Sequence, residues 1–175
     1  MFLNGNELTY VESYKYLGAF INERLNDDQD VQRQIRNLYS RANMLSRKFG
    51  KCSQEVKVRL FKAYCGNSYC GQLWSCVTAQ QVQKLKVAYN NAFRIFLGLP
   101  WRCSASGMFV ENHVYSFGEF TRKEVYNFWS RLISSENLIV YNVVNTGVGP
   151  LALYTYDRWV NLLYSSCTFR LAENG

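Results

Sequence analysis

Catalytic and metal-binding residue types are scarce in this sequence. His113 is the single histidine, and the one adjacent pair of acids is Asp27-Asp28. A serine or cysteine nucleophile would have to use that histidine as its base, and the sequence has no GxSxG elbow. Metal-dependent phosphoryl transfer needs clustered carboxylates, and the other acids are scattered. The sequence therefore predicts no catalytic residue, and no enzyme activity of the chain by itself.

Cofactor and metal motifs are missing as well. Four and five residues separate the three closest cysteines, Cys65, Cys70 and Cys76, so that no CxxC pair exists. Neither a GxxxxGK[ST] phosphate loop nor a GxGxxG turn occurs. We expect reduced structural thiols, no metal ion, no cofactor and no small-molecule substrate.

Prolines and long apolar runs are also few. There are 2 prolines among 175 residues, which favours helices. No run approaches the roughly 18 apolar residues needed to span a bilayer, and the first residues carry no signal-peptide pattern. The sequence predicts an intracellular protein, in the nucleus or the cytoplasm, that does not bind membranes.

Basic residues, by contrast, are concentrated in one stretch. The net charge is +7, yet residues 31–62 alone hold nine basic residues and a single acid, Glu55. A concentrated basic stretch is typical of proteins that bind a polyanion such as nucleic acid. An ordinary solvated helix face would give the same composition, and charge alone leaves the two interpretations open.

The best-patterned element is a helix predicted from Asn26 to Phe49. Asn26 and Gln29 fit a capping box, and acids follow in the first turn. The apolar residues fall in one stripe roughly 80° wide, and the basic ones in an arc of roughly 140° on the opposite side. The stripe comprises Val31, Ile35, Leu38, Ala42, Leu45 and Phe49, and the arc Arg33, Arg36, Arg41, Arg47 and Lys48. One side can pack on a core while the other meets phosphates.

Weaker signals surround this helix. Asn4-Gly5 predicts a short hairpin, and residues 14–21 predict an aromatic-rich strand, in which Gly18 suggests a bulge or a close backbone approach. Ser53, Thr78 and Ser116 are predicted to cap three further helices, and Gly98 to end one of them. We expect Val56, Leu60, Phe61 and Tyr64 to form the apolar side of the helix after Ser53, residues 138–144 to be helix or strand, 147–150 a turn and 156–164 a last short helix.

Three segments, spread over roughly residues 2–134, resemble the region after the palm of non-LTR (LINE-type) retrotransposon reverse transcriptases. The sequence Tyr14-Lys-Tyr-Leu-Gly18 is similar to the strand that leads from palm to thumb in that family. Residues 56–64 with Gln72-Leu-Trp74, and residues 85–100, resemble the helices that follow. The chain departs from the family at residues 66–71, where a proline and a Tyr-Gly are usual, and it lacks the catalytic Asp-Asp motif, the fingers and most of the palm.

The resemblance implies a thumb and connection fragment of an RNA-directed DNA polymerase that grips the template–primer duplex by phosphate contacts. The implied partners are the RNA template, the RNA–DNA duplex and the missing palm and fingers, within a ribonucleoprotein. The implied nucleic-acid-binding residues are Lys15, Arg33, Arg36, Arg41, Arg47, Lys48, Lys57, Arg59 and Lys62.

The predicted architecture is mainly α, with a short N-terminal β-hairpin or strand followed by a thumb-like helical bundle. We expect residues 1–25 to be the end of a palm-like β element, 26–110 the helical bundle and 111–175 a helical connection region. The alternative function is a freestanding basic helical adaptor that binds RNA or an acidic protein. It predicts that the N-terminal hairpin closes without outside strands.

Overall fold

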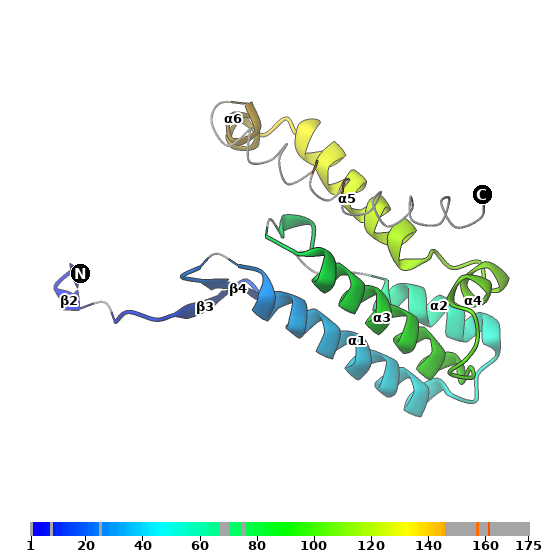
Figure 1. Cartoon of the computed structure of the whole chain (residues 1–175). Helices are drawn as coiled ribbons and strands as arrows, with labels where there is room; N and C mark the ends of the chain where they lie inside the picture. Colours follow the sequence, from blue (N-terminus) through cyan, green and yellow to red (C-terminus); the bar gives the residue numbers. More distant parts are fainter. Residues whose placement is uncertain are drawn as a thin grey trace.

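The computed structural model describes residues 2–7, 9–24, 26–66, 71–74, 76–145, 157 and 161. The described chain is mainly helical, with short antiparallel strands at its start, which confirms the predicted fold class (Figure 1). The strands are β1 (Phe2–Leu3), β2 (Asn6–Glu7), β3 (Ser13–Tyr16) and β4 (Ala19–Asn22). The helices are α1 (Asp28–Phe49), α2 (Gln54–Cys65), the short 3₁₀ helix η1 (Gly71–Leu73), α3 (Ala79–Leu97), α4 (Ala105–Glu111), α5 (Phe117–Ile133) and α6 (Leu138–Asn145). The three predicted domains stay predictions.

Both strand pairs are tight hairpins. Asn4 and Gly5 turn the chain between β1 and β2 with positive φ angles of 50° and 82°, as the sequence predicted. The prediction of one bulged strand over residues 14–21 was wrong. Leu17 and Gly18 both adopt positive φ, 45° and 86°, so that the chain reverses there and β4 pairs antiparallel with β3. A leucine at the first turn position gives no turn signal.

The helix starts follow the predicted caps except in α1. Capping boxes at Thr78 and Ser116 and the cap at Ser53 are confirmed. Helix α1 begins one residue later than its predicted cap implied, with Asp27 in the N-cap position and no side-chain cap hydrogen bond. The predicted Asn26 capping box was wrong because the Asn26 side chain instead accepts a hydrogen bond from Asn22 Nδ2 at 2.7 Å.

Helices α1 and α3 lie side by side and run in the same direction, with α2 as the return between them (Figure 1). Gln81 of α3 donates to Asp28 at the start of α1. About three turns further along both helices, Asn91 Nδ2 of α3 donates to the Tyr39 hydroxyl of α1 at 3.3 Å. The partners are 53 and 52 residues apart in sequence. A nearly constant offset means that the two helices keep their register over about three turns.

The core that α3 shares with α2, α4 and α5 is aromatic. The Phe61 ring of α2 lies edge-on to Tyr89 and Phe93 of α3, with centroids 5.3 and 4.8 Å apart. Phe109 of α4 and Phe120 of α5 stack on the same Tyr89 ring, so that one core joins α2 to α5. Burial raises the pKa of Tyr89, whose hydroxyl donates to the Tyr115 carbonyl at 3.2 Å.

The predicted apolar side of α2 is partly wrong. Val56 and Tyr64 are 43% and 50% exposed, whereas Val58, Phe61 and Cys65 are buried. At 100° per residue the predicted residues fall in an arc of about 140° that meets the buried side only at Phe61. The buried residues recur at three and four residues, which is the spacing of one helix face.

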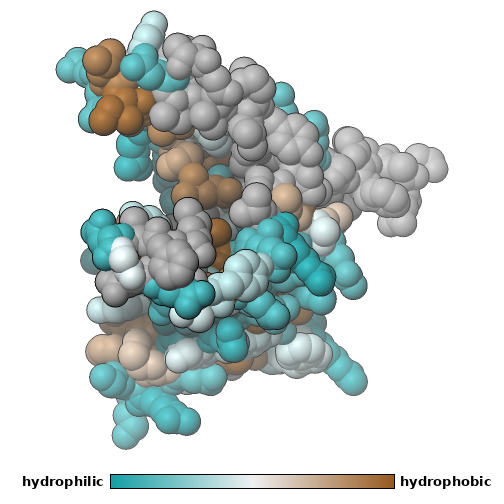
Figure 2. Space-filling model, turned by 90° about the vertical axis from the view of Figure 1, so that its left-hand side faces the viewer, coloured by the Kyte–Doolittle hydropathy of each residue, from teal (hydrophilic) through white to brown (hydrophobic). Residues whose placement is uncertain are grey.

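Two features complete the described fold, the end of α3 at Gly98 and helix α6. Gly98 adopts φ 69° and ends α3 in the left-handed conformation that the sequence predicted. Residues 138–145, left open between helix and strand, form α6, where Leu138 and Ile139 stay 72% and 74% exposed. Hydrophobic residues gather at this end of the molecule (Figure 2). The predicted turn at 147–150 lies outside the described residues, as does the predicted helix at 156–164 apart from Asp157 and Asn161, which are helical.

A single buried carboxylate ties the hairpin β3–β4 to the helices. Asp30, 4% exposed, accepts hydrogen bonds from the Phe20 backbone N–H at 3.1 Å, from Arg33 Nε at 2.9 Å and from Trp74 Nε1 at 3.2 Å. Burial by itself would raise the pKa of Asp30, but these hydrogen bonds, with that from Arg33 the strongest, hold the pKa below its ordinary value.

We expect Asp30→Asn to lower the free energy of unfolding by about 2 kcal/mol at neutral pH, because it removes a charge that three donors share. Since the pKa of Asp30 is lower in the folded chain, its contribution is complete above the unfolded pKa near 3.8 and is lost as the pH falls through the folded pKa. Urea unfolding at pH 7 and pH 3 measures both effects. The control Glu55→Gln breaks an exposed pair with Arg59 and should cost under about 0.5 kcal/mol. Equal losses for the two variants would contradict the assignment.

Candidate nucleic-acid interface

The exposed side of α1 carries three cations that are free to bind a ligand. Val31, Leu38, Ala42 and Leu45 are buried on the opposite side against α2 and α3. Arg36, Arg47 and Lys48 are exposed, and none of them has a hydrogen bond or ion pair within the described part of the chain. The two-sided helix that the sequence predicted is therefore present, with unpaired charge on its outer side.

Arg33 is not among these free cations. Its Nε lies 2.9 Å from Asp30 Oδ1, and the two side chains are only 15% and 5% exposed. A half-buried guanidinium whose charge is already paired has little left to offer a phosphate. The structure thus places this predicted binding residue in the connection between the hairpin and α1.

Arg41 is also engaged within the protein. Its Nη1 donates to the Tyr64 carbonyl at 3.0 Å, one of the last carbonyls of α2. Cations are favourable at that end of a helix because the carbonyls there lack intrahelical partners. Burial raises the pKa of the neighbouring Cys65 thiol to about 11, and the Arg41 charge offsets a part of that increase.

The predicted binding residues of α2 do not form one row. Arg59 is exposed and pairs with Glu55 at 2.6 Å, and Lys62 is exposed on the same side. Lys57 is half-buried and lies about 200° around the helix from Arg59, at roughly 100° per residue. A single duplex backbone therefore cannot follow all three at once.

Lys15 lies far from two of the free cations of α1, Arg47 and Lys48. It stands on β3, opposite Phe20 of β4, with its Nζ 6.0 Å from the Phe20 ring centroid. The Phe20 N–H binds Asp30 in the first turn of α1, whereas Arg47 and Lys48 are in the last turn. A 22-residue helix is about 33 Å long, so these cations are at opposite ends of α1 (Figure 1).

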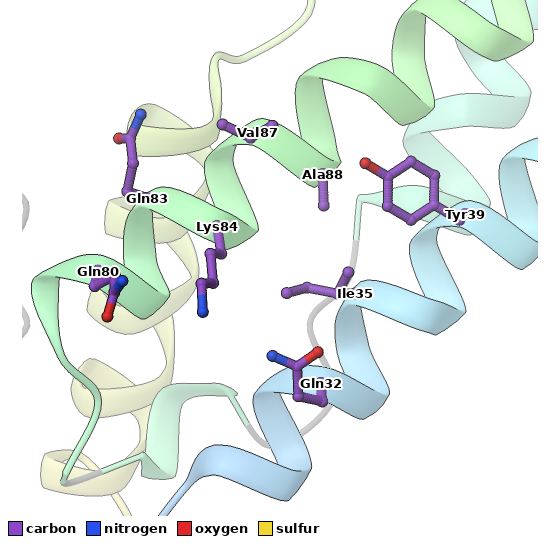
Figure 3. A pocket seen from close by; sticks show the side chains of 8 residues that line it. All are labelled: Gln32, Ile35, Tyr39, Gln80, Gln83, Lys84, Val87 and Ala88. Carbon is purple, nitrogen blue, oxygen red and sulfur yellow. The ribbon is translucent and has the colours of Figure 1, made fainter.

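A groove between α1 and α3 lies beside Arg36, and the sequence patterns did not predict it. Its volume is about 580 Å³, and it is lined by Gln32, Ile35, Tyr39, Gln80, Gln83, Lys84, Val87 and Ala88. Ile35, Tyr39 and Lys84 point into the space between the two helices (Figure 3). Each residue looks unremarkable on its own helix, because the groove arises only when α1 and α3 are paired in parallel. A sequence signal for that pairing is absent.

Neither metal ligands nor a membrane helix belongs to this site. Over the described residues, no three side chains of His, Cys, Asp and Glu come together in a group that could hold a metal ion. The described helices include none long and apolar enough to cross a membrane.

The comparisons with known proteins point to one class of enzyme. No family model matches the chain, and no solved structure matches it. The chain is similar to the RNA-directed DNA polymerase from mobile element jockey of Drosophila funebris, with 24% identity over 140 residues. The match covers 77% of this chain and 15% of the polymerase. This supports a distant relation to reverse transcriptases and leaves open which region of the enzyme the chain represents.

We expect Arg41→Ala and Arg47→Ala to differ in stability. Arg41→Ala removes a hydrogen bond to the end of α2 and should lower the free energy of unfolding by about 1 kcal/mol. Arg47→Ala removes an exposed, unpaired side chain and should change it by less than about 0.5 kcal/mol. Chemical denaturation of the two single variants measures the difference. Equal stability would show that the contact between Arg41 and Tyr64 contributes nothing.

Proposed function

We propose that this chain is a non-catalytic thumb and connection part of an RNA-directed DNA polymerase of a non-LTR retrotransposon, and that it grips the template–primer duplex by phosphate contacts. The similarity to the jockey polymerase supports the enzyme class. The order of elements, short strands followed by a basic helix that packs on others, supports the thumb assignment.

The observation that carries the proposal is the set of free cations on α1. Arg36 and Arg47 are eleven residues apart and lie within about 20° of each other around the helix, so that roughly 16 Å separates them along the same side. Lys48 broadens that side next to Arg47. Contacts spread over such a length reach several phosphates of one backbone without reading bases. We call Arg36, Arg47 and Lys48 the α1 cationic side.

The hairpin β3–β4 supports attachment to further parts of a polymerase. Tyr14, Tyr16 and Ile21 share one face of the hairpin, since side chains alternate along a strand and Tyr14 pairs with Ile21. These side chains are 63%, 57% and 49% exposed. An apolar sheet face of this kind is usually covered in a complete protein. We propose that the palm of the parent polymerase covers it and supplies the catalytic carboxylates, with the fingers beyond.

The freestanding adaptor is the weaker candidate. It predicts that the N-terminal hairpin closes without outside strands, and both described hairpins do pair within the chain. The open face of Tyr14, Tyr16 and Ile21 among the described residues is what favours attachment to a further part of a polymerase. As part of a polymerase, the chain would act in a ribonucleoprotein in the nucleus or the cytoplasm, and cell fractionation with RNase treatment tests that location.

Replacing the α1 cationic side with alanines should weaken binding to an RNA–DNA template–primer about 100-fold at low salt and lower the slope of log affinity against log salt by about 2 to 3. The reason is that three phosphate contacts no longer release counterions. Fluorescence anisotropy over a salt series measures both quantities.

The matched control for that variant replaces Lys86, Lys123 and Arg131, which removes the same charge from α3 and α5. It should keep most of the salt slope of the wild-type chain. The same loss in both variants would mean that net charge alone drives binding, and an unchanged slope in the α1 variant would exclude α1 as the interface.

The open hairpin face gives a further prediction. The double variant Tyr14→Ser and Ile21→Ser should change the free energy of unfolding by less than about 0.5 kcal/mol, because these side chains do not pack on the helices. It should also reduce concentration-dependent self-association in analytical ultracentrifugation. For comparison, Phe61→Ala in the core should cost about 3 to 5 kcal/mol. A large loss from the hairpin variant would favour the self-contained adaptor.

A further inference from the structure

The groove between α1 and α3 presents neutral amides that no part of the described chain uses. Gln32 is on α1, and Gln80 and Gln83 are on α3. All three are exposed, and within the described residues none of their amides has a hydrogen-bond partner. Figure 3 shows Gln32 directed at the gap between the helices and Gln80 at its edge.

The floor of the groove is apolar and ends at a hydroxyl. Ile35 and Ala88 form the floor between the helices (Figure 3). The Tyr39 hydroxyl accepts a hydrogen bond from Asn91 Nδ2 at 3.3 Å, which leaves its own hydrogen available to an acceptor. The groove therefore offers groups that both donate and accept, beside a surface that suits C–H groups.

The charge around the groove favours an anionic ligand. Among the described residues that line it, Lys84 is the one charged side chain and none is a carboxylate. Arg36 follows Gln32 by four residues, which places it about 40° further around α1, on the outer edge of the groove. Cations thus flank the neutral amides on both helices.

We propose that this groove is a site for the ribose edge of an RNA strand, in which the amides of Gln32 and Gln80 bind 2′-hydroxyls while Arg36 and Lys84 contact the adjoining phosphates. This assignment rests on the proposed function, because the α1 cationic side holds the same duplex. A 2′-hydroxyl both donates and accepts, as a glutamine amide does, and DNA has none.

The shape of a duplex with an RNA strand suits such a site. In A-form geometry the minor groove is wide and shallow and exposes 2′-hydroxyls, so that side chains on a helix surface reach them. The apolar floor at Ile35 would lie against sugar C–H groups. The phosphates on either side would meet Arg36 on α1 and Lys84 on α3.

The test compares an RNA–DNA hybrid with a DNA duplex of the same sequence, at one salt concentration, using the full chain. The wild-type chain should prefer the hybrid. The double variant Gln32→Leu and Gln80→Leu should lose about fivefold to tenfold of that preference, since two hydrogen bonds to the RNA strand are removed. Its affinity for the DNA duplex and its salt slope should stay unchanged.

Gln29→Leu is the matched control, because Gln29 is an exposed glutamine on the same helix as Gln32 and is not among the described residues that line the groove. It should keep the wild-type preference, and thermal unfolding followed by circular dichroism confirms that all variants fold. An equal preference in the wild-type chain and the double variant would overturn the assignment and favour a protein partner for the groove. If the alanine variant of the α1 cationic side still loses binding, duplex binding by the chain stands and only the groove assignment fails. If that variant also binds normally, the proposed function and the groove assignment both fail.

Discussion

The arrangement of the strands relative to the helices depends on one buried carboxylate. Asp30 is in the first turn of α1, yet it binds the backbone of β4, a side chain one turn later and the indole of Trp74 beyond α2. A buried charge is tolerated only when hydrogen bonds stabilise it, and these three donors reach both oxygens of the carboxylate. As a consequence, the Arg33 guanidinium is paired within the protein and is not offered to a ligand.

Parallel packing of α1 and α3 also decides which side chains remain on the surface. Because α2 returns the chain, residues about 52 apart in sequence become neighbours on two helices that run together. The aliphatic buried stripe of α1 packs against the core that α3 shares with the other helices, and the outer flanks of α1 and α3 leave a groove between them. Arg41 fixes α2 against α1 through the Tyr64 carbonyl, so that a second cation of the basic arc has a structural use.

The sequence predicted most of what depends on local chemistry. The caps at Ser53, Thr78 and Ser116, the left-handed Gly98 and the two-sided pattern of α1 all follow from residue type and helical spacing. The turn at Leu17 was missed because leucine rarely takes positive φ. The internal roles of Arg33 and Arg41 could not be predicted, since their partners are a buried acid and a backbone carbonyl that only the fold brings close. The groove was missed for the same reason: its lining residues belong to helices whose pairing no pattern specifies.

A basic arc is therefore a poor measure of the charge that a helix offers to nucleic acid. Of the five arginines and lysines in the arc of α1, two are held by contacts within the protein, and those that remain lie at Arg36 and at the pair Arg47 and Lys48. A few spaced cations give salt-dependent affinity without a fixed register, because every phosphate looks alike to them. Selectivity must then come from groups that distinguish one duplex from another. Neutral amides beside the cations can do so without adding to non-specific binding, since their hydrogen bonds form only where a sugar or base offers a partner at the right place. The division between charged and neutral contacts on α1 and α3 is what a protein needs if it is to slide along any sequence while still recognising the kind of strand that it holds.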